Sequence, residues 1–123
     1  MSVKIWWDDT GIYQDFSCVT GAVYLFSIYG RHTTAESLAY WHGYLKAEFY
    51  DASWTKMGEQ VLDDLKPTDP LDQWILMKGS ATSPAGSVYG RMFLSISNWN
   101  ASAGGAAYFD NASVGCMNLL GHS

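Results

Sequence analysis

The sequence predicts an all-β protein, an antiparallel β-sandwich with jelly-roll topology and about eight strands. Three observations lead to this prediction. Short segments rich in β-branched and aromatic residues follow one another along the chain. Turn residues separate them at roughly regular spacing, and no internal repeat or domain boundary interrupts the pattern. Many short strands joined by turns are typical of sandwiches and jelly rolls, so we expect one domain over residues 1–123.

The first third of the chain contains three expected strands. Lys4 to Trp7 is a short β-prone start, and the turn Asp8 to Gly11 follows it. Ile12 to Val19 alternates between apolar and polar positions. Ala22 to Arg31 is the strongest strand, because its side chains alternate throughout. Its expected core face comprises Tyr24, Phe26 and Ile28.

The middle of the chain is less regular. Apolar residues between His32 and Tyr44 have near-helical spacing, so a helix is a live alternative there. We favour a long loop that enters a strand at Tyr44 to Tyr50. Glu59 to Leu62 is a weaker strand. Asp63 to Asp72 carries four Asp and two Pro, which predicts an irregular loop.

Three further strands complete the set, at Gln73 to Ala81, Val88 to Ser97 and Ala106 to Val114. Asp110 and Asn111 place two polar residues inside the last of them. Such a pair suggests a β-bulge, a metal site or a polar pair on the surface.

Charge excludes several classes of partner. The net charge is −5, and the seven Lys and Arg residues lie singly along the chain. Nucleic-acid surfaces need clustered cations, so we expect no nucleic acid partner. We also expect no membrane partner, because no apolar run approaches the ~20 residues of a spanning helix. The negative net charge does not oppose the binding of a neutral or cationic ligand.

The aromatic content is high for the size of the domain. Phe, Trp and Tyr make up 15% of the residues, with six Trp and eight Tyr. Some of this aromatic surface should be exposed, and exposed apolar patches mark binding sites. Cys18 and Cys116 lie far apart in the chain. A disulfide that would stabilise the protein by about 4 to 5 kcal/mol and two free thiols are equally compatible with the sequence.

The tryptophans are the main candidates for ligand contacts. Trp54, Trp99 and Trp41 lie in or beside predicted loops, and Trp7 is a possible fourth platform. We expect Trp74, which opens an apolar strand, to lie in the core. Sugar rings stack on exposed indoles, and polar side chains bind their hydroxyls. The polar candidates are His42, Arg31, Gln73 and Asn98.

The sequence contains no motif that is specific for catalysis. The acidic residues could form pairs like those of a glycosidase, but solvated turns explain most of them. No nucleophile elbow, phosphate loop or zinc-protease motif occurs. We therefore assign no catalytic residues.

Five segments in order resemble jelly-roll carbohydrate-binding modules of the galactose-binding-like type, over about residues 4–114. These segments are Gly11 to Phe16, Val23 to Tyr29, Ala47 to Asp51, Ala81 to Gly86 and Ala107 to Val114. Such modules accompany cellulases and xylanases. The resemblance implies a non-catalytic, extracellular module that binds a polysaccharide, most simply a β-1,4-glucan such as cellulose or xyloglucan, and that is tethered to a glycoside hydrolase. It also implies a structural Ca²⁺ at Asp110.

Two other functions remain open from the sequence. A sandwich module for protein–protein contact would use the same aromatics as interface anchors. A small glycan-active hydrolase would use two of the acids and would need a carboxyl group of raised pKa.

Overall fold

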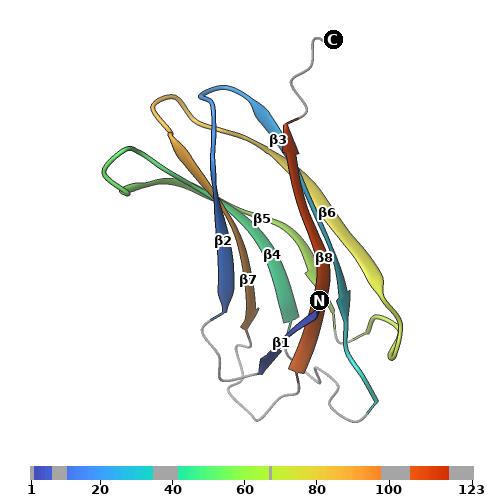
Figure 1. Cartoon of the computed structure of the whole chain (residues 1–123). Helices are drawn as coiled ribbons and strands as arrows, with labels where there is room; N and C mark the ends of the chain where they lie inside the picture. The colour runs from blue at the N-terminus through green and yellow to red at the C-terminus, as the bar shows by residue number, and fades with distance from the viewer. Residues whose placement is uncertain (1, 7–10, 35–41, 67, 98–105, 117–123) are drawn as a thin grey trace.

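The computed structural model describes residues 2–6, 11–34, 42–66, 68–97 and 106–116, in which the regular structure consists of eight strands (Figure 1). In chain order they are β1 (Ser2–Trp6), β2 (Ile12–Ser17), β3 (Val23–Arg31), β4 (His42–Tyr50), β5 (Lys56–Leu65), β6 (Ile75–Thr82), β7 (Tyr89–Ser97) and β8 (Ala106–Cys116). The described part contains no helix that is long and apolar enough to cross a membrane.

The strands form two four-stranded antiparallel sheets that face one another. Sheet A has the order β1-β8-β3-β6, and sheet B has the order β2-β7-β4-β5. The chain passes repeatedly from one sheet to the other, and strands distant in sequence become neighbours, as β3 and β8 do (Figure 1). The predicted antiparallel sandwich of about eight strands is confirmed.

The core lies between the two sheets, and strands such as β3, β4, β6 and β8 contribute alternate side chains to it. Tyr24, Phe26 and Ile28 of β3 are buried, as the alternation predicted. Sheet B buries residues such as Leu45 and Met92 opposite them. A fully buried apolar side chain of this size stabilises the fold by about 1.5 to 3 kcal/mol, so this alternation supplies most of the driving force.

Most strand boundaries differ from the sequence predictions by one to three residues, and the clearest differences lie in the middle of the chain. Strand β5 begins at Lys56 and continues through Asp63 and Asp64 to Leu65, so the loop predicted from Asp63 onward begins later. The two aspartates are compatible with a strand because it is an edge strand, where polar side chains reach solvent. Strand β4 begins at His42 rather than Tyr44. Of the region where a helix was an alternative, residues 35–41 lie outside the described residues.

The interruption predicted at Asp110 and Asn111 is a β-bulge. The register between β3 and β8 shifts between Ser27 and Tyr29, and Asn111 has a positive φ of 61°. The extra residue increases the local twist. The cysteines are both free thiols: Cys18 is partly buried and Cys116 is exposed.

Gly90 is a point where the packing between β2 and β7 depends on the absence of a side chain. A Cβ placed on Gly90 would lie 2.3 Å from the Phe16 ring. This ring also packs against Tyr24 and Phe26 of the opposite sheet, with ring centroids 5.2 and 5.7 Å apart. Phe16 therefore covers the glycine and joins the two sheets.

We predict that Gly90→Ala lowers the free energy of unfolding by about 1 to 3 kcal/mol, because the new methyl group displaces the Phe16 ring from this contact. Urea unfolding measures the change. Gly115→Ala is the control, because a Cβ there meets no atom within 4 Å. Equal midpoints for the two variants would contradict this account of the packing.

Candidate functional site

The outer face of sheet B carries aromatic and charged side chains in rows across the strands. Alternation sends every second side chain away from the core. In the central row Arg91 of β7 pairs with Asp15 of β2 and with Glu48 of β4, which pairs with Glu59 of β5. We call this surface the sheet B platform. Its defining residues are Tyr13, Asp15, Glu48, Tyr50, Lys56, Glu59, Tyr89 and Arg91, with Trp54 from the β4–β5 turn.

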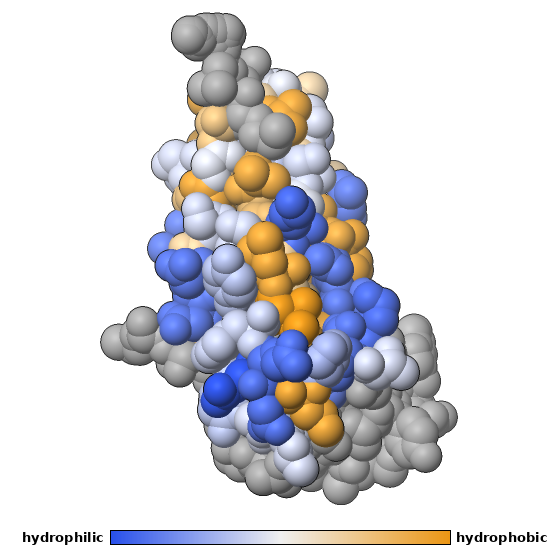
Figure 2. All heavy atoms as spheres, turned by 90° about the vertical axis from the view of Figure 1, so that its right-hand side faces the viewer, coloured by the Kyte–Doolittle hydropathy of each residue, from blue (hydrophilic) through white to orange (hydrophobic). Residues whose placement is uncertain are grey.

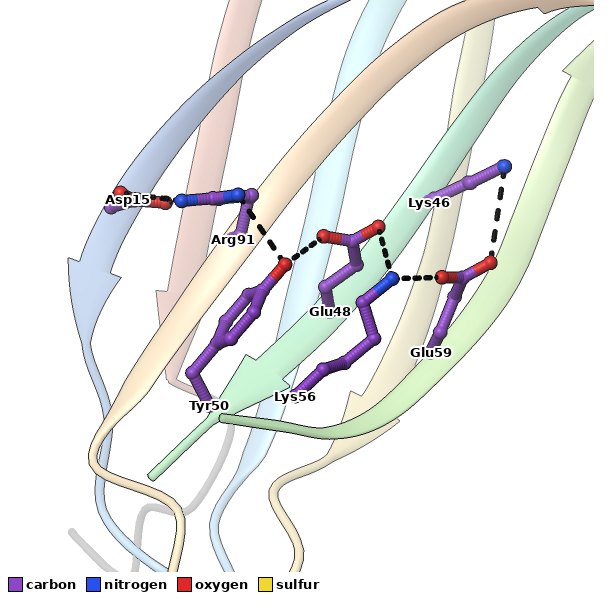
Figure 3. Close-up of polar contacts among 7 residues, drawn as sticks. All are labelled: Asp15, Lys46, Glu48, Tyr50, Lys56, Glu59 and Arg91. Atoms are coloured by element: carbon purple, nitrogen blue, oxygen red, sulfur yellow. Dashed lines mark hydrogen bonds and ion pairs between the residues drawn. The ribbon is translucent and has the colours of Figure 1, made fainter. Parts of the chain in front are cut away.

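Arg91 is the central cation of the platform. Its Nε and Nη2 donate to the two carboxylate oxygens of Asp15 at 2.6 and 3.2 Å, and its Nη1 donates to the Tyr50 hydroxyl at 3.3 Å (Figure 3). The guanidinium carbon lies 3.8 Å from the centroid of the Tyr13 ring. Bidentate pairing with Asp15 raises the pKa of Arg91. The group is therefore a permanently charged donor in a defined orientation.

A second chain of contacts continues across β4 and β5. The Tyr50 hydroxyl donates to Glu48 Oε1 at 2.5 Å, and Lys56 Nζ lies 3.4 Å from Glu48 Oε2. Lys56 Nζ also donates to Glu59 Oε1 at 2.6 Å, and Lys46 Nζ lies 3.9 Å from Glu59 Oε2 (Figure 3). Glu48 and Tyr50 point outward but are buried beneath these neighbours.

The network sets the protonation states of its members. Burial, with the hydrogen bond to Glu48, raises the pKa of Tyr50, so its hydroxyl stays protonated and keeps donating. The hydrogen bond between Lys56 and Glu59 raises the pKa of Lys56 and lowers the pKa of Glu59. Both groups therefore stay charged near neutral pH.

Trp54 forms the aromatic end of the platform. Its indole stacks on the Tyr89 ring with centroids 4.1 Å apart and planes 5° apart, and Tyr50 lies beside it with centroids 5.6 Å apart. Trp54 is nonetheless 44% exposed. One face of the indole is thus supported by Tyr89, while much of the ring remains open to a ligand.

The turn that carries Trp54 holds it in an unusual backbone conformation. Trp54 has a φ of +63°, in the left-handed region that bulky residues rarely adopt. Asp51 stabilises the turn, since its Oδ1 accepts from the backbone N–H groups of Ser53 and Thr55 at 2.8 and 2.9 Å. The Trp54 N–H donates to the Asp51 carbonyl at 3.0 Å. A strained residue held in place by its surroundings is typical of binding sites.

The platform suits the binding of a flat, neutral molecule. Three cations and three anions on this face of sheet B balance one another, namely Lys46, Lys56 and Arg91 with Asp15, Glu48 and Glu59. Planar donors and acceptors lie beside exposed ring surface. Glu59 does not suit the role of a proton donor in catalysis, which needs a carboxyl group of raised pKa, because the pKa of Glu59 is lowered.

The structure separates the residues that the sequence marked as ligand contacts. Trp54 is on the sheet B platform. Arg31 ends β3 in sheet A, and Gln73 lies exposed in the loop before β6. His42 begins β4, and its side chain is not among those described. The remaining candidates lie outside the described residues: Trp7, Trp41, Asn98 and Trp99.

The prediction that Trp74 lies in the core is wrong. Its side chain is 40% exposed, and the Arg31 guanidinium lies 5.0 Å from its ring centroid. The apolar residues after Trp74 suggested burial, but a residue at the start of a strand can face either side. Gly30 pairs with Ile75 and both point inward, so Trp74 points outward.

Several platform residues were missed by the sequence reasoning. Arg91, Tyr89 and Tyr13 were assigned to strands but not to a site. The sequence feature that could have indicated them is the period-two alternation of polar and aromatic residues in two strands. These residues form a common surface only when the two strands pair.

Asp110, the predicted calcium ligand, lies in sheet A at the bulge of β8, and its Oδ1 accepts from the Asn111 N–H at 2.8 Å. Among the described residues no group of three or more His, Cys, Asp or Glu could hold a metal ion. Calcium also takes backbone carbonyl and amide oxygens, and the calcium prediction is carried by the resemblance alone.

Comparisons with known proteins reveal the fold but no sequence relative. No protein-family model and no curated protein matches the sequence. The C-terminal family 22 carbohydrate-binding module of Clostridium thermocellum Xyn10B matches the structure with a TM-score of 0.60 and 15% identity, over 85% of this chain and 64% of that one. The chain has the fold of a jelly-roll carbohydrate-binding module.

Two other solved structures show that proteins of different function share this fold. The N-terminal CBM22-1–GH10 modules of Clostridium thermocellum Xyn10B, complexed with xylohexaose, match with a TM-score of 0.64 and 14% identity over 92% of this chain and 20% of that chain. The VP2 subviral particle of infectious bursal disease virus matches with a TM-score of 0.62 and 8% identity over 92% and 29%. This chain thus spans less than two thirds of each of these proteins. One sandwich fold serves unrelated functions, so function has to be argued from the site.

We predict that the platform network makes stability depend on pH in the acid range. The folded-state pKa of Glu59 lies below its ordinary value of 4.5. A carboxyl group of this kind stabilises the fold above its unfolded-state pKa, and the contribution is lost as the pH falls through the folded-state pKa. Below pH 4.5 the melting temperature should therefore fall more steeply in the parent protein than in Glu59→Gln.

Melting temperatures measured by circular dichroism from neutral pH down to acid check this difference. Lys56→Gln serves as the second variant, since it removes the same hydrogen bond from the donor side and should also flatten the curve. Parallel curves for the parent and both variants would show that the Lys56–Glu59 bond has no part in acid stability.

Proposed function

We propose that this protein is a non-catalytic module that binds a neutral β-1,4-linked polysaccharide on the sheet B platform. The observation that carries the proposal is the exposed indole of Trp54, supported by Tyr89, beside a charge-balanced network of hydrogen-bonding groups around Arg91. Pyranose rings have apolar faces that stack on aromatic rings and hydroxyl edges that need donors and acceptors. The platform presents both.

Charge balance supports a neutral ligand. Arg91 and Lys56 are each paired with a carboxylate, so an anionic polymer would have to break existing pairs. A neutral chain can accept from Arg91 and Lys56 and donate to Glu59 without displacing them. Its affinity should depend little on salt, since few new ion pairs form.

The fold likeness agrees with this function. One neighbour is described by ligand binding in its cleft, and another is complexed with xylohexaose and joined to an endo-1,4-β-xylanase. We favour a β-glucan such as cellulose chains or xyloglucan as the ligand of this protein, with xylan as the alternative. We propose that the module acts outside the cell, tethered to a glycoside hydrolase that it brings to its substrate.

Hydrolysis is the less favoured function. A retaining or inverting glycosidase needs one carboxyl group that stays protonated near neutral pH. Lys56 holds Glu59 in the charged form. Glu48 accepts hydrogen bonds from both Tyr50 and Lys56. The platform carboxylates are therefore better suited to orienting ligand hydroxyls than to donating protons.

We predict that Trp54→Ala weakens binding by about 5- to 150-fold, the equivalent of ~1 to 3 kcal/mol for one stacked ring. Isothermal titration with cellohexaose and xylohexaose measures the change. The parent protein should bind one or both with a micromolar to millimolar dissociation constant, about −4 to −8 kcal/mol. The melting temperature should stay within a few degrees, because the indole is nearly half exposed.

Leu25→Ala is the matched control, since Leu25 is also exposed but lies in sheet A. It should bind like the parent. If Trp54→Ala also binds like the parent, the platform is not the site. If the parent binds neither oligosaccharide, the proposed function is wrong.

Calcium at Asp110 stays a separate prediction. If a structural Ca²⁺ is bound there, chelation with EDTA should lower the melting temperature and leave oligosaccharide affinity at the sheet B platform largely unchanged, because Asp110 belongs to the other sheet. Scanning calorimetry with and without chelator measures this. Identical melting curves would remove the claim.

A further inference from the structure

The outer face of sheet A carries a second set of aromatic and polar side chains. Arg31 of β3 pairs with Tyr108 of β8, and its neighbour on the other side is Trp74, because Gly30 pairs with Ile75. In the next outward-facing row Tyr29 pairs with Leu76 and with Asp110. We call these two rows the sheet A patch: Trp74, Arg31 and Tyr108, then Leu76, Tyr29 and Asp110.

Arg31 occupies the centre of the patch between two aromatic rings. Its guanidinium carbon lies 5.0 Å from the Trp74 ring centroid and 5.5 Å from the Tyr108 ring centroid. Contacts of this kind hold the guanidinium in one orientation. Its Nε is buried and has no hydrogen-bond partner among the described residues. A buried donor of this kind gains from a ligand that brings an acceptor.

A hollow lies next to this arginine. Tyr29, Trp74, Asp110 and Asn111 line it, and its volume is about 460 Å³. Its wall includes the β-bulge, where Asn111 adopts a φ of +61°. The side chains around it offer a phenol hydroxyl, a carboxylate and an amide beside an exposed indole. The sheet B platform likewise presents phenol hydroxyls and carboxylates beside an exposed indole, on the other face.

The loop that brings Trp74 to the patch is held at several points. The fully buried His32 accepts from the Asp72 N–H through its carbonyl at 2.8 Å, and its ring Nε2 contacts the Asp69 carbonyl at 2.8 Å. The Thr34 N–H and hydroxyl donate to the two carboxylate oxygens of Asp72 at 3.2 and 2.5 Å. Trp74 is therefore positioned before any ligand arrives, which reduces the entropic cost of binding.

The sheet A patch is separate from the sheet B platform, because the two surfaces lie on opposite outer faces of the sandwich. Figure 2 views the side of the molecule on which β6 lies, and it shows a narrow run of hydrophobic side chains bordered by hydrophilic ones.

We propose that the sheet A patch is a second glycan-binding site, which takes one or two sugar rings of a neutral chain through Trp74 and Arg31. The assignment of a glycan as the ligand rests on the proposed function. The existence of a binding site at Trp74 and Arg31 rests on the structure of sheet A alone. Arg31 and Asp110 balance in charge, which favours a neutral ligand. With one exposed indole instead of the Trp54–Tyr89 stack, this site binds more weakly than the platform. A protein with both sites can hold two polysaccharide chains at once.

The test is titration of the full chain with cellohexaose and xylohexaose. Calorimetry measures the number of sites and their affinities, and the indole N–H signals in NMR report which tryptophans contact the sugar. The parent protein should show two sites per molecule, and Trp54→Ala and Trp74→Ala should each retain one. The double variant should bind at least tenfold more weakly than Trp54→Ala. Leu25→Ala, on the same face but beyond the hollow, should keep both sites.

The NMR signal keeps the test valid even if Trp74→Ala is unstable. Trp74→Phe assigns the Trp74 indole signal, which should shift on titration of the otherwise intact Trp54→Ala protein. If Trp54→Ala neither binds nor shifts this signal, the sheet A site is excluded and the sheet B site stands. If only the Trp74 variants lose binding, the sheet A site stands and the platform assignment is wrong. If the parent binds neither sugar, both proposals fail.

Discussion

The burial of alternate side chains between two sheets is the constraint on which the rest of this structure depends. Each strand gives one face to the core, so Phe26, Ile28, Leu45 and Met92 point inward. The residues between them have to point outward. Every candidate site described above is built from this second set. The same alternation that makes the core therefore determines which side chains are available to a ligand.

Antiparallel pairing then turns single outward residues into surfaces. Arg91 contributes little to binding by itself, but between β2 and β4 it meets Asp15 and Tyr50 and acquires a single orientation. Exposed ion pairs of this kind add little to stability, typically about 0 to 1 kcal/mol. Their role is better understood as orientation of donors and acceptors, which favours specificity over stability.

Trp54 and Trp74, the exposed tryptophans of the described part of the chain, are positioned by similar means. Trp54 follows an aspartate that caps its turn, and its own φ is positive. Trp74 follows a loop in which Asp72 has a φ of +61° and is held by Thr34. In both cases a carboxylate satisfies backbone or hydroxyl donors and stabilises a left-handed residue near the indole. Rigid presentation of a large side chain is what a binding surface needs, since each ring then loses little freedom when a ligand stacks on it.

The sequence by itself determined the sandwich, most strand positions and the buried face of β3, because alternation is a local property that a chain carries without its neighbours. It also indicated that an aromatic-rich chain with few, scattered cations suits a neutral ligand. Only the tertiary structure decided which outward residues meet. Asp15 and Arg91 are 76 positions apart in sequence, and no local pattern connects them. Trp74 shows the same limit. Its apolar neighbours suggested burial, but the register with β3 turned it outward, and a shift of one residue would have reversed this.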